Sequence, residues 1–361
     1  MLRWVWRACW LLVPIAFVVH RVYHQETAAF ILACLSLVPL ARAMGDATEE
    51  LAERLGPAAG GLLNATFGNA AELIVGLFAL AAGRVELVKG SITGSIIGNM
   101  LLVGGGAMLA ASLKKKRPRF NRTAAGASMA LLFLALVAIS TPTIVHGLHE
   151  VHPGDVRRMS VAIAALLLVM YGLSLLFQLR THAELLGPPT DLTPSEGLPI
   201  VTHDPDAARG PAWKPLALLG AAGVATAVAS ETLVGSLEGA LLTLKLPEAF
   251  VGVVIVAIAG NAAEHSTAVT LAHKGRLDVG LGIAWESSKQ VVLLVAPVLV
   301  LFGTAIGQPM DLAFRPFEVA AVGTAVIATA LVALDGETNW LEGAYLLVVY
   351  AVLALGIYYV R

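Results

Sequence analysis

Long apolar segments separated by short polar connections make up most of this chain. Their length matches the ~20 residues that an α-helix needs to cross the hydrocarbon core of a bilayer. They lack the period-two alternation of a lipid-facing barrel strand, and residues 124–139 are apolar on every side. The pattern therefore predicts an all-α, polytopic membrane protein of about eleven transmembrane helices. The predicted spans are residues 4–20, 27–44, 58–82, 88–112, 123–146, 156–180, 214–235, 247–273, 279–303, 313–334 and 340–360.

The composition agrees with this pattern. Hydrophobic residues make up 57% of the chain and charged residues 14%, whereas soluble domains average about 45–50% and about 25%. The spans leave no room for a sizeable soluble catalytic domain, and the sequence contains no His-Glu-x-x-His metal motif. We therefore do not expect an enzyme. The net charge of −1 gives no indication of a nucleic-acid partner.

The distribution of lysine and arginine predicts the orientation. These residues are more numerous on the side of the N-terminus, chiefly because of Lys114-Lys115-Lys116-Arg117. Since positive residues favour cytoplasmic loops, we expect the N-terminus in the cytoplasm and the C-terminus outside. The sequence shows no organelle-targeting segment, which favours the inner membrane of a prokaryotic cell. The longest connection, residues 181–213, is rich in proline and is expected to be a cytoplasmic linker between two halves.

The sequence Gly-Asn-Ala-Ala-Glu occurs twice, at residues 68–72 and 260–264. The offset of 192 residues persists without gaps, so that Gly83-Arg84 corresponds to Gly275-Arg276. The two copies lie on predicted spans that are five spans apart, so the second copy enters the membrane in the opposite direction. Such inverted repeats are typical of alternating-access carriers, whose substrate site lies near the bilayer midplane.

Each copy of the motif places a carboxylate inside a membrane span. A charge there costs at least ~2.5–3.5 kcal/mol on insertion scales, so an unpaired glutamate needs a partner or a function. In each copy the asparagine and the glutamate are three residues apart and should share one helix face. The spans that follow add neutral oxygen donors. The candidate ion-binding and proton-exchanging residues are Glu72, Glu264, Asn69, Asn261, Ser95, Asn99, Ser287, Ser288 and Gln290.

This set of donors favours a hard cation. Ca²⁺ takes about six to eight oxygen ligands from carboxylates, amides, carbonyls and water. Cys9 and Cys34 lie in apolar stretches and provide no thiolate site for a softer metal. We expect Glu72 and Glu264 to hold Ca²⁺ as a transported substrate, with no resident cofactor.

Two carboxylates in one site favour exchange. The empty site would carry a charge of about −2, which is expensive to move through a medium of low dielectric. One Ca²⁺ or two protons neutralise it, so both loaded forms can reorient. The residues alone leave open Na⁺, K⁺ or Mn²⁺ as the ion, the number of protons, and a cation channel. They also leave open a structural pairing of the glutamates with a base inside the spans, for which we identify Lys289 alone, one cation for two carboxylates.

The repeated motifs and four further segments resemble the cation/proton exchanger branch of the calcium:cation antiporter superfamily over nearly the whole chain. The resemblance implies Ca²⁺/H⁺ antiport, with Ca²⁺ held by Glu72 and Glu264. It implies an extra first helix (1–26) and two inverted five-helix halves (27–180 and 214–361). It also implies gating by the helices that precede the repeats, which carry Glu49, Glu50 and Glu231. The further segments are residues 45–50, 62–67, 230–231 and 335–343.

The segment 285–290 departs from the family, which usually has a small, neutral Gly-Ser-Ser-x-Gln on this helix. Glu286 and Lys289 are three residues apart and can pair on one helix face, which would add no net charge to the site. If Lys289 pointed at the glutamates instead, it would compete with the cation; we expect the pair. His265 follows Glu264 and is a further candidate modulator of proton exchange, or a core histidine bonded to a carbonyl.

Three histidines, His146, His149 and His152, cluster with Glu150 in one predicted outer connection. Imidazoles at this density can bind Zn²⁺ or sense pH, and a solvated loop without such a role is the alternative. The partners that we expect are Ca²⁺ and protons as substrates and the lipid bilayer. The oligomeric state is left open.

Overall fold

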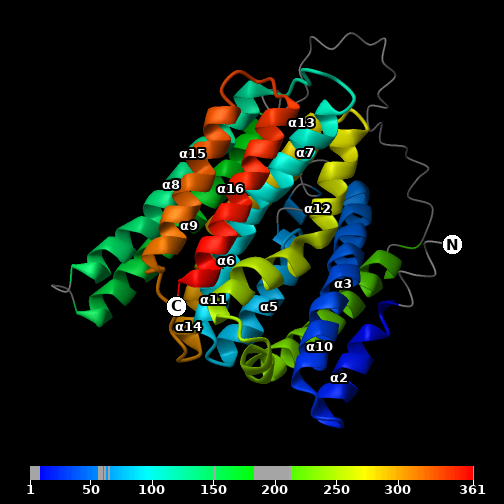
Figure 1. Ribbon diagram of the computed structural model, residues 1–361, viewed down its shortest axis with the longest axis vertical. Helices are drawn as coiled ribbons and strands as arrows, with labels where there is room; N and C mark the ends of the chain where they lie inside the picture. Colours follow the sequence, from blue (N-terminus) through cyan, green and yellow to red (C-terminus); the bar gives the residue numbers. More distant parts are fainter. Residues whose placement is uncertain are drawn as a thin grey trace.

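The computed structural model describes residues 9–55, 60, 62–63, 66–148, 152–182, 211 and 213–360. Within these residues the chain is helical, apart from turns, connections and one isolated β-bridge between Arg119 and Glu337. The prediction of an all-α, polytopic membrane protein is confirmed (Figure 1). The elements are α2 Leu12–Arg21, α3 Glu26–Leu55, α5 Ala70–Ala81, α6 Val85–Ile97, η1 Gly98–Val103, α7 Gly104–Ser112, α8 Arg122–Gly147, α9 Pro153–Leu176, η2 Phe177–Thr181, α10 Trp213–Leu244, α11 Glu248–Phe250, η4 Val251–Val256, α12 Ala257–His273, α13 Leu277–Gln290, η5 Val291–Val295, α14 Ala296–Ala305, α15 Pro316–Val332 and α16 Trp340–Tyr359.

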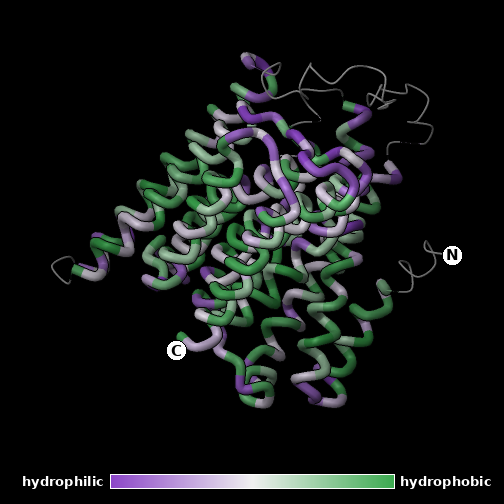
Figure 2. Tube along the Cα trace, turned by 45° about the horizontal axis from the view of Figure 1, so that its top comes forward, coloured by the Kyte–Doolittle hydropathy of each residue, from purple (hydrophilic) through white to green (hydrophobic). Residues whose placement is uncertain are grey.

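The helices form one elongated bundle (Figure 1). In the described part of the chain, 8 helices are long and apolar enough to cross a membrane, and three shorter apolar helices, α2, α5 and α15, lie where three further spans are predicted. Hydrophobic residues follow the helices along the bundle, and hydrophilic residues gather toward its ends (Figure 2). The number of membrane spans, eleven, remains a prediction.

Elements that are 192 residues apart have matching bounds. Helix α6 at Val85–Ile97 corresponds to α13 at Leu277–Gln290, and α7 corresponds to α14. The turns before α6 and α13 match as well, because Gly83 (φ 75°) and Gly275 (φ 88°) both adopt the left-handed conformation that favours glycine. The sequence repeat thus extends to backbone conformation.

A π-helical segment interrupts both of these long helices at the same place. Segment η1 follows α6, and η5 follows α13. Such segments are rare and often lie at functional sites, because the wider turn displaces the side chains that follow it. The two halves of the chain therefore carry the same irregularity near the middle of the bundle.

The halves meet where α6 crosses η4. A side chain at Gly94 would place its Cβ 2.1 Å from the carbonyl oxygen of Val253, and one at Gly90 would lie 3.3 Å from Cα of Gly252. Only glycine permits such a close backbone approach. This contact brings Ser95, the residue after Gly94, against the helix that carries the second Gly-Asn-Ala-Ala-Glu motif.

Candidate functional site

The two copies of the motif adopt different backbone structures. Residues 260–264 lie inside the continuous helix α12, where Asn261 and Glu264 share a face as expected. In the first copy, Gly68 and Asn69 form a turn, and Asn69 is the residue that precedes α5. The expectation that Asn69 and Glu72 sit within one helix is therefore wrong. Glu72 lies in the first turn of α5 instead.

The two glutamates approach each other across the interface between the halves. Glu72 has a relative exposure of 9%. Its Cγ lies against the glycine of the second motif, because a Cβ built on Gly260 would be 3.7 Å away. Glu264 follows Gly260 by one turn of α12, so both carboxylates belong to this contact between the halves. The structure thus brings together the two carboxylates that the repeat singles out.

Each motif asparagine bonds a serine from the opposite half. The Nδ2 atom of Asn261 donates to Oγ of Ser95 at 3.0 Å. In the corresponding pair, Oγ of Ser287 donates to Oδ1 of Asn69, also at 3.0 Å. Because Ser95 and Ser287 occupy equivalent positions in the repeat, these two contacts are related by the exchange of the halves.

Three further polar side chains extend this network without such a counterpart. Asn99 donates to Oγ of Ser287 at 3.0 Å, and the amide of Asn69 donates to Oε1 of Gln290. The Nε2 atom of His265 lies 3.0 Å from Oδ1 of Asn99. His265 therefore contacts the predicted site through an amide side chain and not through a backbone carbonyl.

Two buried acceptor oxygens of α12 have no hydrogen-bond donor within the described part of the chain. They are Oδ1 of Asn261 and Oε2 of Glu264. A buried oxygen without a donor is costly unless something else satisfies it. Carboxylate and amide oxygens are the ligands that a hard cation such as Ca²⁺ prefers.

The other predicted site residues lie outside this cluster. Ser288 is buried but donates to the carbonyl of Ala284 in its own helix. Glu49 and Glu50 are exposed near the end of α3, and Glu50 pairs with Arg54. Glu231 is exposed on α10 and pairs with Arg21 at 2.8 Å. Their gating role is untested and remains a prediction.

The expected pair between Glu286 and Lys289 is confirmed. The Lys289 ammonium group donates to Oε1 of Glu286, and the lysine side chain is 5% exposed. The second carboxylate oxygen of Glu286 lies 3.5 Å from Nε2 of Gln178 in η2. The two charged residues that depart from the family pattern, Glu286 and Lys289, thus neutralise each other within one helix turn.

The sequence interpretation missed a second base inside the bundle. Lys89 lies in the second turn of α6 with a relative exposure of 8%. Its Nζ atom donates to Oδ1 of Asp311 at 2.6 Å and to the carbonyl of Ala313 at 2.7 Å. The statement that Lys289 alone serves as a base within the spans is therefore wrong. Lys89 is the second residue of the predicted span 88–112, a position where a lysine is normally expected to reach the water outside the bilayer.

Several predicted features fall partly outside the described residues. The structure does not describe His149, Glu150, most of the 181–213 linker or two residues of the 62–67 segment. His146 and His152 are described and exposed. Among the described residues, no group of three or more His, Cys, Asp and Glu could hold a metal ion.

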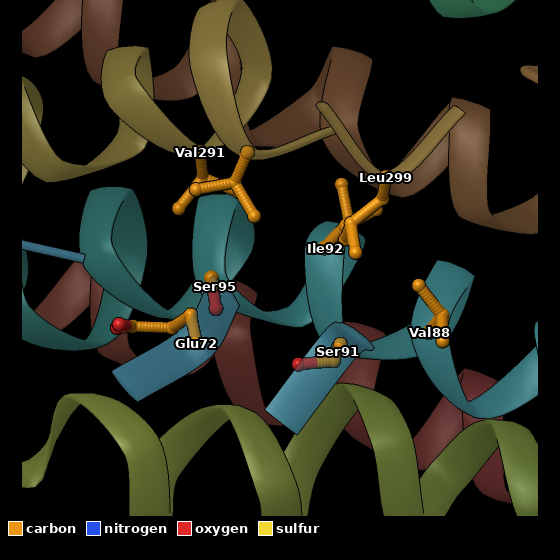
Figure 3. Close-up of a pocket in the computed structure, with 9 residues that line it drawn as sticks. Glu72, Val88, Ser91, Ile92, Ser95, Val291 and Leu299 are labelled. Carbon is orange, nitrogen blue, oxygen red and sulfur yellow. The ribbon is translucent and has the colours of Figure 1, made fainter. Parts of the chain in front are cut away.

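A small cavity lies beside Glu72, between α5, α6 and the helix formed by η5 and α14. Figure 3 shows Glu72, Ser91 and Ser95 along one side of it, facing Val291 and Leu299. Ser91 was not predicted as a site residue.

Comparison with known proteins gives long matches. The model of the sodium/calcium exchanger protein family matches residues 26–180 and 214–359. The chain is 44% identical over 359 residues to a Ca²⁺/H⁺ antiporter of Synechocystis sp., covering 96% of this chain and 95% of that protein. It is 42% identical over 355 residues to a Ca²⁺/H⁺ antiporter of Aphanothece halophytica, with coverage of 97% and 95%.

Solved structures give the same picture. The structure of native YfkE aligns with a TM-score of 0.81 and 33% identity, covering 96% of this chain and 97% of that one. The structure of an H⁺/Ca²⁺ exchanger, CAX, aligns with a TM-score of 0.67 at 15% identity, which shows a shared fold.

Proposed function

The chain belongs to the sodium/calcium exchanger protein family, in its cation/proton exchanger branch, and we propose that it exchanges Ca²⁺ for protons across a membrane. Relatives that match it over nearly their whole length carry the name Ca²⁺/H⁺ antiporter. The site described above supplies a chemical reason for the same activity here.

We propose that Glu72 and Glu264 bind either one Ca²⁺ or protons. The observation that carries this proposal is the pair of buried oxygens, Oδ1 of Asn261 and Oε2 of Glu264, that lack donors one helix turn apart. Both atoms belong to the second motif, and Glu72 of the first motif lies against the same motif. A divalent cation could take both of these oxygens as ligands.

The charge of the site enforces the exchange. Without a ligand, two carboxylates would carry about −2 through an apolar interior, which is unfavourable at low dielectric. One Ca²⁺ removes this charge, and so do two protons. The protein therefore reorients only when it is loaded, and Ca²⁺ and protons move in opposite directions.

Alternating access would follow from the inverted repeat. The two motif asparagines each contact the opposite half, so a relative movement of the halves changes which side of the membrane reaches the glutamates. The N-terminus would lie in the cytoplasm and the C-terminus outside, as the distribution of positive residues predicts.

The test is uptake of radioactive Ca²⁺ by proteoliposomes under an imposed pH gradient, with the internal pH followed by a dye. We expect Ca²⁺ to accumulate on the acidic side while that side becomes less acidic. Excess unlabelled Na⁺, K⁺ or Mn²⁺ tests the other ions, because a transported competitor must itself dissipate the gradient. Ca²⁺ movement that is independent of the pH gradient would contradict exchange and indicate a channel.

A further inference from the structure

We propose that the cavity beside Glu72 is the path by which Ca²⁺ reaches the exchange site from the predicted outer face. In this proposal Ser91 is the polar residue at its mouth, and Leu299 is the side chain that closes it. The proposal rests on the proposed function and adds to it the identity of the outer path.

The cavity follows α6 from its first turn to the exchange site. Helix α6 begins at Val85, after the turn that we predict on the outer side. Val88, Ser91 and Ser95 line the cavity in that order along α6, and Glu72 lines it as well. Ser91 and Ser95 are four residues apart, so their hydroxyl groups lie one above the other on one helix face. A polar strip thus runs toward Glu72.

The exposure of the lining residues identifies the mouth. Of the nine residues that line the cavity, Ser91 is the only one that is not buried. Ser95 and Val88 have relative exposures of 2% and 1%. In Figure 3 the hydroxyl of Ser91 lies on the same side of the cavity as Glu72 and Ser95, and Val291 and Leu299 form the opposite wall.

Leu299 closes the cavity against the backbone of α5. It is 1% exposed. A Cβ built on Gly76 would lie 2.8 Å from Cδ1 of Leu299, so the leucine side chain would have to shift to admit a larger residue there. A leucine on a glycine makes an apolar contact without hydrogen bonds. Apolar constrictions exclude ions by excluding water, and they open when one side chain turns aside.

The second half of the repeat lacks this arrangement. The residues that correspond to Ser91, Gly76 and Leu299 are Ile283, Ala268 and Ala107. On that side the helices meet directly, since a Cβ on Gly280 would be 2.5 Å from the carbonyl oxygen of Ala268. The serine and leucine therefore distinguish the two sides of an otherwise repeated site.

The first test measures access to position 91. Cys9 and Cys34 are first replaced by alanine, and Ser91→Cys is then exposed to a membrane-impermeant, positively charged thiol reagent in vesicles of known orientation. We expect labelling from the outer side, slower labelling in saturating Ca²⁺, and faster labelling when Leu299→Ala is added. Ile283→Cys is the matched control from the other half, and it should not react from the outer side.

Labelling only from the inner side, no protection by Ca²⁺, or no effect of Leu299→Ala would overturn the proposal. Labelling without protection would mean that the cavity admits water but not the transported cation. Failure of the unsubstituted protein to exchange Ca²⁺ for protons would count against the proposed function instead.

The second test requires no cysteine. We expect Ser91→Ala to raise the KM for outer Ca²⁺ about fivefold, the effect of one lost polar contact. Ser91→Thr keeps the hydroxyl and should retain the KM of the parent protein. Equal KM values for serine, alanine and threonine would overturn the role of Ser91 even if Ser91→Cys did not insert.

Discussion

The side-chain amide of Asn261 donates a hydrogen bond of 3.0 Å to the hydroxyl of Ser95, a residue of the opposite half of the chain. Asn69 and Ser287 form the corresponding contact with the direction of the bond reversed. Each asparagine that accompanies a glutamate is thus held by the other half. The proposed site is a joint property of the two halves, and substitutions in either half should affect it.

Asn69→Ala and Asn261→Ala should weaken Ca²⁺ binding more than they slow turnover. Each change removes a neutral oxygen and the asparagine's contacts across the interface, two for Asn69 and one for Asn261, but leaves the charge of the site unchanged. We expect the KM for Ca²⁺ to rise about five- to tenfold in transport assays. Thr324→Ala, which removes an exposed hydroxyl bonded to its own helix, is the control and should have no effect. A fall in maximal rate at unchanged KM would argue against a ligand role for the asparagines.

Lys289→Ala should impair transport by leaving the Glu286 carboxylate without its partner. The Lys289 side chain is 5% exposed and the Glu286 side chain is 40% exposed, so the carboxylate left alone stays partly solvated and we expect a partial loss of rate. Glu286→Gln combined with Lys289→Gln removes both charges and should restore most of the rate. If Lys289→Ala alone lowered the KM for Ca²⁺, the lysine would be a competitor of the transported ion and the pairing account would fail.

Lowering the pH on the side from which Ca²⁺ binds should raise the KM for Ca²⁺. Ca²⁺ needs deprotonated carboxylates, so protons compete with it for Glu72 and Glu264. The maximal rate at saturating Ca²⁺ should change less than the KM. Initial rates at several pH values, with the pH of the opposite side held constant, would measure this competition. A KM that is independent of pH would show that protons and Ca²⁺ use separate sites.

Lys89→Met should destabilise the protein. The Lys89 ammonium holds Asp311 and the carbonyl of Ala313, and its loss leaves both acceptors short of a donor. We expect a loss of about 1–3 kcal/mol, seen as a lower melting temperature in detergent. Arg158→Met breaks the exposed pair with Asp155 and should change the melting temperature little. Equal shifts for the two variants would mean that burial does not strengthen the Lys89 pair.

The sequence predicts the class of fold and the central residues well, because both depend on strong local signals. Runs of apolar residues identify the long helices, and a repeated motif with an intramembrane glutamate identifies Glu72 and Glu264. The Glu286–Lys289 pair also follows from helical spacing alone. These features require no knowledge of how distant segments pack.

Other features depend on packing that a pattern does not contain. Nothing in the repeated motif reveals that the first copy begins a helix at Ala70 while the second lies inside one. Ser288 follows Ser287 but turns to the carbonyl of Ala284, because neighbouring residues point to different sides of a helix. Lys89 finds Asp311 in a connection 222 residues away, a pairing that no local spacing indicates.

The most direct test of the central claim compares Glu72→Gln and Glu264→Gln with the parent protein in proteoliposomes, recording Ca²⁺ uptake and internal pH together. Each substitution keeps the size of the side chain and removes one of the two charges. The account predicts that both variants insert in the membrane, since removal of a buried charge relieves a cost, and that neither exchanges Ca²⁺ for protons. Exchange at a near-normal rate by either variant, at the same protein content, would contradict the account.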